Sequence, residues 1–278
     1  MYLDTTEPST GHSRRLWLHS AGQFDRVLQT PFLRSLSEGT LDRHLFTVFV
    51  ESDREFLLSY VRCLNLLAYA SDEWDECRVL QELVAGIFAE LEAVHDARPG
   101  GRDVALAGAA LQAETSLREV VRDYRACIEA GAATLARDMW AAQVGPVAGA
   151  GSPRSSHTAA VYASRRARLF LLALLLPCMA LYARIGTALQ PRLTSTSTTA
   201  AKAPSMPPAY RDWIATYAGD AFQLRAWGME ALLDKWVESL CTEYEQDVHQ
   251  VDEWLACDAY AVALDHEVRL FAAASHET

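Results

Sequence analysis

The stretch that most constrains the fold of this chain is residues 169–186, LFLLALLLPCMALYARIG. Its uninterrupted apolar part, residues 169–183, is 15 residues long and contains Pro177. A membrane-spanning helix needs about 20 apolar residues, and proline disturbs the interior of a helix. We therefore interpret this stretch as a buried core helix rather than as a membrane span.

Two side chains of this stretch can do chemistry. Cys178 carries a thiol and Tyr182 a phenol, and they are four residues apart. Side chains at this spacing share one face of a helix. The sequence therefore predicts a nucleophile and a hydrogen-bonding ring beside the same cavity.

The rest of the chain shows helical periodicity and no convincing β-alternation. A short helix that begins at Pro31 is expected to end at Gly39, and Thr40 is expected to cap the next helix. The fold class is therefore all-α, a bundle of about eight helices. Ligand sites in such bundles lie between facing helices.

Composition separates a tail and a surface loop from the helical domain, and it argues against nucleic acid as a partner. We expect an N-terminal tail at residues 1–11, a single helical domain at residues 12–278, and a surface loop in the Ser/Thr/Pro-rich segment 190–208. The net charge of −11 and the pI near 5.2 argue against nucleic-acid binding, which depends on clustered Lys and Arg. Small molecules or other protein chains are the expected partners.

The six cysteines are scattered and form no CxxC pair, which predicts free thiols in a reducing compartment. The first twenty residues contain no apolar run of the secretory type. We therefore expect a cytoplasmic protein that does not insert in a membrane.

Three chemically capable residues lie on apolar helical faces: Asp53, Cys178 and Glu267. Asp53 is in phase with Phe56 and Tyr60, at spacings of three and seven residues. Taken singly, a buried cysteine usually acts as a small hydrophobe, and a lone carboxylate is usually solvated. They form a site only if the fold brings them together.

Five segments, in order along the chain, are similar to motifs of the TenA proteins, also called thiaminase II or aminopyrimidine aminohydrolases. The segments are PFLRSLSEGTL (31–41), DREFLLSY (53–60), LALLLPCMALYARIG (172–186), YRDWIATYAGDAF (210–222) and EVRLF (267–271). The third resembles the most specific motif of the family, LAALLPCxWLYxEIG. Five ordered matches make this chain resemble a divergent member of the family.

The resemblance implies a haem-oxygenase-like fold and a chemistry that uses no metal, haem or other cofactor. It implies that Cys178 is the nucleophile, that Glu267 transfers protons, and that Asp53 holds the ring amino group and helps to activate the thiol. The pocket-shaping residues would be Phe56, Tyr182 and Tyr217. The implied reaction is hydrolysis of thiamin, or of an aminomethylpyrimidine from its breakdown, to hydroxymethylpyrimidine in thiamin salvage. The implied assembly is a homo-oligomer, up to a tetramer.

The chain departs from the family pattern at several places. Ser52 replaces a preferred Gln, Phe56 a frequent Tyr, and Phe271 a Trp, and little sequence follows Phe271. The segment that supplies a pocket tyrosine has its nearest equivalent at HTAAVY (157–162), so His157 or Tyr162 is the candidate for that role. Residues 102–151 exceed the expected length and are interpreted as an inserted or extended helical element.

Two other interpretations remain open. A di-iron oxidase would use Glu-x-x-His and similar spacings, for which the candidates are Glu92 with His95, Glu245 with His249, and Asp265 with His266. The alternative is that these are exposed charges on amphipathic helices, which carries more weight. The second interpretation is a non-catalytic homologue that binds a pyrimidine or a partner protein.

Overall fold

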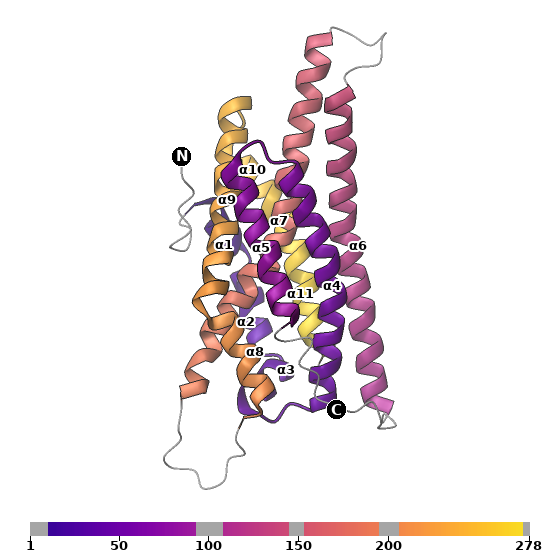
Figure 1. Ribbon diagram of the computed structural model, residues 1–278, viewed down its shortest axis with the longest axis vertical. Helices are drawn as coiled ribbons and strands as arrows, with labels where there is room; N and C mark the ends of the chain where they lie inside the picture. Colours follow the sequence, from indigo (N-terminus) through magenta and orange to yellow (C-terminus); the bar gives the residue numbers. More distant parts are fainter. Residues whose placement is uncertain (1–10, 93–107, 145–152, 195–205, 275–278) are drawn as a thin grey trace.

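The computed structural model describes residues 11–92, 108–144, 153–194 and 206–274, and within these residues all regular structure is helical (Figure 1). The helices are α1 (His12–His19), α2 (Ala21–Leu28), α3 (Pro31–Glu38), α4 (Arg43–Tyr69), α5 (Trp74–Glu90), α6 (Gly108–Val144), α7 (Pro153–Thr194), α8 (Pro208–Ala218), α9 (Asp220–Tyr244), α10 (Val248–Leu255), the π-helical turn η2 (Ala256–Tyr260) and α11 (Ala261–Ala273). The all-α prediction is confirmed. The helices outnumber the expected eight because the chain before α4 forms three short helices.

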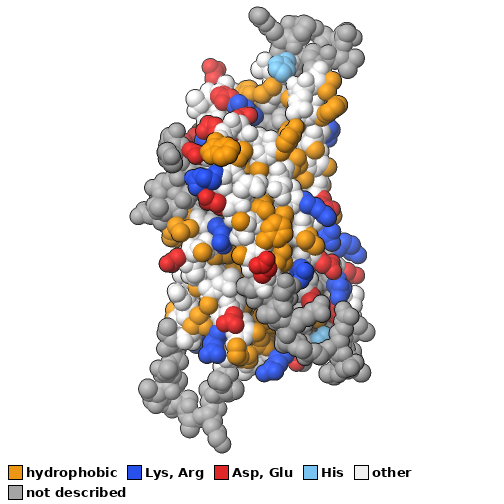
Figure 2. Space-filling model, in the orientation of Figure 1, with side chains coloured by type: hydrophobic (Ala, Val, Ile, Leu, Met, Phe, Trp, Pro, Cys, Tyr) orange, Lys and Arg blue, Asp and Glu red, His pale blue; other side chains and the backbone are white. Residues whose placement is uncertain are grey.

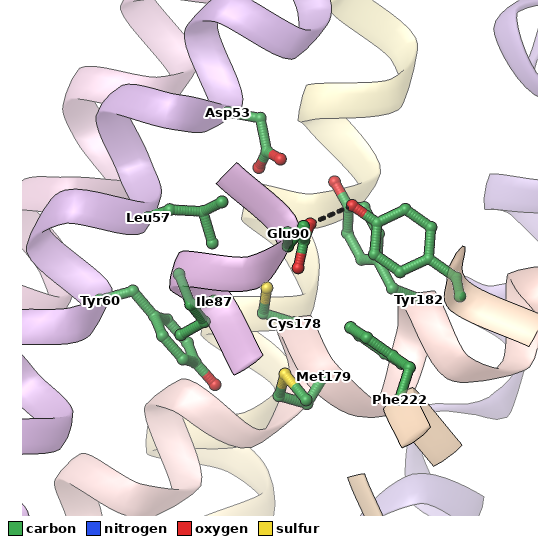
Figure 3. Close-up of a pocket in the computed structure, with 10 residues that line it drawn as sticks. Asp53, Leu57, Tyr60, Ile87, Glu90, Cys178, Met179, Tyr182 and Phe222 are labelled. Carbon is green, nitrogen blue, oxygen red and sulfur yellow. Dashed lines mark hydrogen bonds between the residues drawn. The ribbon is translucent and has the colours of Figure 1, made fainter. Parts of the chain in front are cut away.

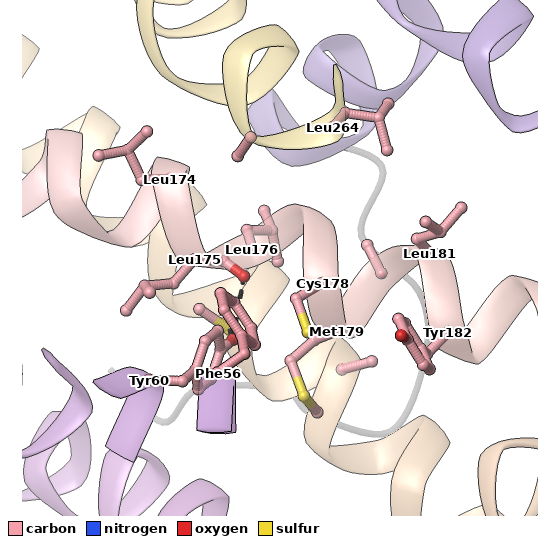
Figure 4. Packing of buried hydrophobic residues seen from close by; sticks show 14 of the residues in the cluster. Phe56, Tyr60, Leu174, Leu175, Leu176, Cys178, Met179, Leu181, Tyr182 and Leu264 are labelled. Atoms are coloured by element: carbon pink, nitrogen blue, oxygen red, sulfur yellow. Dashed lines mark hydrogen bonds between the residues drawn. The ribbon is translucent and has the colours of Figure 1, made fainter. Parts of the chain in front are cut away.

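Helix α7 is the central element of the bundle, and residues 169–186 form its middle. Residues 157–193 of α7 are the one candidate membrane span among the described residues, but 89% of their most apolar window is buried inside the bundle. Residues from α4 and α11 pack on this part of the helix (Figure 4). The interpretation as a core helix is confirmed.

Helix α7 extends beyond both of its expected ends. It starts at Pro153, and it runs through Gly186 and Pro191 to Thr194, so the first five residues of the predicted loop 190–208 are helical. Residues 195–205 of that loop lie outside the described residues. Gly186, which we expected to end the helix, instead allows close packing: an added Cβ would lie 2.4 Å from the backbone of Tyr217 and Ala218 in α8.

Local capping fixes where α4 begins. Helix α3 ends at Gly39, which has the left-handed φ of 73° that favours glycine. Asp42, and not the predicted Thr40, caps α4, because its carboxylate accepts hydrogen bonds from the backbone N–H groups of His44 (2.8 Å) and Leu45 (3.1 Å). This start sets the helical phase that carries Asp53 and Tyr60 into the core.

The described part of segment 102–151 is helix α6, which packs along α4, α7 and α11. The upper ends of α6 and α7 project together beyond the other helices (Figure 1). Buried residues from α1 to α11 share one hydrophobic core. On the face drawn in Figure 2, acidic and basic side chains are intermixed and form no continuous basic band among the described residues.

Candidate functional site

A cavity lies among α4, α5, α7, α8 and α9, beside the middle of α7 (Figure 3). The side chains that line it are those of Asp53, Leu57, Tyr60, Ile87, Glu90, Cys178, Met179, Tyr182, Tyr217 and Phe222. The space among these side chains, together with the open solvent at the pocket mouth, is about 290 Å³. Asp53, Cys178, Tyr182 and Tyr217 were candidates from the sequence, and the fold brings them to this one cavity.

Cys178 follows Pro177 on α7 and is buried among acidic groups. Burial raises the pKa of its thiol well above the ordinary value, and the nearby carboxyl groups of Glu267 and Asp53 raise it further. In the empty cavity Cys178 is therefore a thiol. A reaction that uses it as a nucleophile needs a base or a cation to form the thiolate.

Glu267 on α11 is 1% exposed and faces Cys178 and Tyr124. Burial raises the pKa of its carboxyl to about 8, although the hydrogen-bonding groups of Tyr124 and Cys178 offset part of the rise. Its Oε2 atom has no hydrogen-bond partner among the described residues. A buried carboxyl with this pKa can both take up and release a proton near neutral pH.

Asp53 on α4 is buried at the edge of the same cavity (Figure 3). Its pKa is raised well above the ordinary value, first by burial and then by the charges of Glu90 and Glu267. A neutral Asp53 can donate one hydrogen bond and accept others, which suits recognition of a ring nitrogen and an amino group.

Glu90 on α5 is a cavity residue that we did not predict. It accepts a hydrogen bond from the hydroxyl of Tyr217. Burial raises the pKa of its carboxyl to about 7, and the Tyr217 hydrogen bond and Arg225 limit the rise. The sequence held a signal, because Glu90 is in phase with buried Leu83 and Ile87 on α5, as Asp53 is with its apolar neighbours on α4.

Aromatic side chains pack around the polar groups of the cavity. The ring of Tyr182 contacts those of Tyr217 (4.9 Å between centroids) and Phe271 (5.6 Å), and the Tyr182 hydroxyl has no hydrogen-bond partner among the described residues. Phe56 does not line the cavity but stacks on Tyr124 at 4.4 Å. Tyr124 lies on α6, inside the segment interpreted as an insertion, and the sequence analysis missed it.

The fold does not bring the segment at residues 157–162 to the cavity. His157 is exposed, and it precedes Cys178 by 21 residues on the same helix, which corresponds to about 31 Å. The Tyr162 hydroxyl instead donates to Oε1 of Gln246 at 3.0 Å. The candidate role of His157 required the chain to fold back toward the cavity before Cys178. Instead α7 runs from Pro153 to Thr194 without a turn, so His157 and Cys178 lie far apart on one helix.

The residues of the di-iron interpretation are dispersed. Among the described residues, no three His, Cys, Asp or Glu side chains are grouped so that they could hold a metal ion. Glu92, Glu245 and His249 are exposed. His95 lies outside the described residues, and His266 stacks on Tyr124 at 5.0 Å.

Comparisons with known proteins identify the fold. Over 95% of this chain, two solved structures superpose with a TM-score of 0.56: a TenA family transcription regulator from Silicibacter sp. TM1040 (19% identity, 96% of that chain) and a TenA homologue from P. horikoshii OT3 (14% identity, 98% of that chain). The chain therefore has the all-helical fold of these TenA structures, as the sequence motifs predicted.

Curated relatives at the sequence level are distant. The chain is 24% identical over 229 residues to the mitochondrial bifunctional TH2 protein of Arabidopsis thaliana, and 23% identical over 266 residues to the thiamine biosynthesis multifunctional protein ThiED of Corynebacterium glutamicum. These matches cover 82% and 95% of this chain but only 33% and 27% of the relatives, so the chain spans about a third or less of their length. No protein-family model matches the chain.

Proposed function

We propose that this protein hydrolyses thiamin, or an aminomethylpyrimidine derived from it, to hydroxymethylpyrimidine, with Cys178 as the nucleophile. The observation that carries the proposal is the convergence of the Cys178 thiol, the Glu267 carboxyl and Asp53 from α7, α11 and α4 at one buried aromatic site. The TenA fold and the name of the ThiED relative, a thiamine biosynthesis protein, support thiamin-related chemistry.

In the first step Glu267 accepts the proton of Cys178, which creates the thiolate. This transfer leaves the total charge of the cavity unchanged, because one anion replaces another. It therefore avoids the large energy of adding a charge to a buried site. Asp53 holds the amino group of the pyrimidine, and the thiolate sulfur then bonds to a ring carbon.

Addition of sulfur pushes electron density into the ring, so the bond between the exocyclic carbon and its leaving nitrogen breaks. Glu267 returns its proton where the leaving nitrogen requires one. Water then adds to the exocyclic carbon and gives up a proton, and the carbon–sulfur bond breaks to restore the thiol. In sum, one water is consumed, and hydroxymethylpyrimidine is released together with ammonia from aminomethylpyrimidine, or together with the neutral thiazole and a proton from thiamin.

The test is to incubate the purified protein with thiamin and with aminomethylpyrimidine, and to follow hydroxymethylpyrimidine by chromatography. Cys178→Ala should abolish its release while leaving ligand binding nearly intact. The matched control is Cys257→Ala, because this thiol is exposed and distant in sequence. Full activity of Cys178→Ala would refute the nucleophile, and absence of turnover with retained binding of hydroxymethylpyrimidine by the unaltered protein would favour a non-catalytic pyrimidine-binding protein.

A further inference from the structure

The proposed reaction leaves one buried acid of the cavity without a task. Glu90 contributes neither the nucleophile nor the proton transfer, yet its side chain lines the cavity between those of Cys178 and Tyr182 in the view of Figure 3. Tyr217 donates to its Oε1 atom. Glu90 is 8% exposed, and its side chain faces the cavity, where a ligand can reach it.

The wall around Glu90 carries no positive charge. The lining residues include the acids Asp53 and Glu90 but no Lys, Arg or His. The nearest cation on α9, Arg225, lies outside this lining and packs where Gly86 leaves room, since an added Cβ at Gly86 would lie 2.4 Å from the Arg225 Nε atom. A buried acid without a pairing cation in its cavity is suited to a ligand that brings the positive charge.

The three acids of the site differ in how readily they ionise. The Glu90 pKa is about 7, the Glu267 pKa is about 8, and the Asp53 pKa is raised well above its ordinary value. Tyr217 and Arg225 both stabilise the Glu90 anion and so limit the rise of its pKa that burial causes. Near neutral pH, Glu90 can therefore carry a negative charge.

We propose that Glu90 is a specificity-determining residue, which binds the positively charged nitrogen substituent of the pyrimidine and so makes the cavity prefer the amine substrate to the alcohol product. The inference rests on the proposed function, and it adds the charge class of the substrate. A neutral hydroxymethyl group gains much less from an anionic partner than an ammonium group does. The same residue would therefore favour substrate entry and product release.

The test compares two ligands that differ in that one substituent. Aminomethylpyrimidine and hydroxymethylpyrimidine are titrated by calorimetry at pH 7.5 into Cys178→Ala protein, which cannot turn over the amine. We expect the amine to bind more tightly than the alcohol. Adding Glu90→Gln, which keeps an oxygen to accept from Tyr217 but loses the charge, should weaken amine binding by about tenfold or more and change alcohol binding by less than about twofold.

Two further variants separate charge from structure. Glu90→Asp keeps a carboxylate and should keep part of the preference for the amine. Glu92→Gln removes an exposed charge two residues further along the chain and should leave both affinities unchanged. Binding of the alcohol by each variant shows that its cavity is folded. If Glu90→Gln does not fold, an amine preference in Glu90→Asp as strong as that in Glu92→Gln decides against the proposal.

The outcomes distinguish this inference from the proposed function. If neither pyrimidine binds to the protein with Cys178 intact or replaced, the proposed function is wrong, and the role of Glu90 is wrong with it. If both bind but Glu90→Gln changes the two affinities by the same factor, the site is a pyrimidine site and Glu90 does not determine specificity. A selective loss of amine affinity supports the assignment.

Discussion

Carboxyl groups are buried in two regions of this bundle, and only one region neutralises them. Between α5, α7 and α9, Glu76 is 3% exposed and lies 2.9 Å from the Lys235 Nζ atom and 3.8 Å from an Arg168 nitrogen. Glu267 does not line the cavity but faces the Cys178 thiol behind it; it is equally buried, and burial raises its pKa with no offsetting cation among the described residues. Ion pairs such as those of Glu76 are typical of a network that stabilises the fold. An unpaired buried carboxyl such as that of Glu267 lowers the stability of the fold but can react with a proton or a ligand.

The surroundings of Arg168 reinforce the contrast. Its guanidinium donates to the carbonyl of Ala70 at 2.9 Å, pairs with Asp72 at 3.3 Å, and lies over the ring of Trp236 at 4.2 Å. These contacts join α7 to the end of α4, the start of α5, and α9. The charged network therefore joins α4 and α5, which carry the cavity acids Asp53 and Glu90, to α7 and α9.

The largest expected effect is on catalysis. Glu267→Gln should lower turnover of aminomethylpyrimidine by about 10²- to 10⁴-fold, because the amide cannot transfer protons. The free energy of unfolding at pH 7 should stay equal or rise, since the amide removes a carboxyl that burial disfavours as an anion. Turnover and urea unfolding measure the two effects; a variant that is both active and much less stable would contradict the contrast.

Breaking the neutralised region should have the opposite result. Arg168→Met should lower the free energy of unfolding by about 3–5 kcal/mol, because it leaves Glu76 buried without one of its cations. Turnover per folded molecule should change little. The matched control is Arg118→Met, whose ion pair with Glu114 is half exposed and should be worth less than about 1 kcal/mol.

The cavity acids should also make stability depend on pH. Glu90 and Glu267 have pKa values of about 7 and about 8 in the folded chain, against 4.5 ordinarily. From about pH 4.5 upward the unfolded chain releases these protons first, so the folded state loses stability until about pH 8. The loss is at most about 1.4 kcal/mol per pH unit for each group.

Thermal unfolding from pH 4.5 to 8.5 measures how the stability of the fold falls with pH. Because other groups of the chain also titrate in this range, the variants are compared with the unaltered protein. Glu267→Gln should flatten the fall between pH 4.5 and 8, whereas Glu92→Gln should leave it unchanged. Identical pH profiles for the unaltered protein and Glu267→Gln would show that this carboxyl is not held as we describe.

The smallest expected effect concerns the packing that supports Tyr217. Gly186→Ala places a Cβ 2.4 Å from the α8 backbone, which should lower the free energy of unfolding by about 1–3 kcal/mol and weaken the Tyr217 contact with Glu90. Gly22→Ala is the control, because nothing lies within 4 Å of its added Cβ. Calorimetric unfolding of both variants should separate them, and equal effects would contradict the close-packing explanation.

The sequence predicted what depends on one helix at a time. The burial of residues 169–186 and the shared face of Cys178 and Tyr182 follow from periodicity within a helix. The same periodicity placed Asp53 on an apolar face but left open whether it is buried. The TenA motifs then predicted the fold that the structural comparison confirmed.

What the sequence did not predict depends on how helices are placed against one another. Glu90 and Tyr124 have the same apolar phase as many structural residues, and only the packing of α5 and α6 on α7 brings them to the site. The position of His157 was misjudged because it was taken from the similarity of residues 157–162 to a family motif and not from the periodicity of the helix. Instead, α7 starts at Pro153 and carries His157 away from the cavity.

The π-helical turn η2 has a consequence for how this site can vary. A π-turn holds one residue more than an α-turn, and η2 ends seven residues before Glu267. The wider turn therefore absorbs one residue, and deleting a residue within η2 should leave the helix after it in nearly the same phase. Deleting a residue in α11 between η2 and Glu267 would instead rotate Glu267 by about 100° away from Cys178. Single-residue length changes are thus tolerated at η2 but not in the regular helix that follows it.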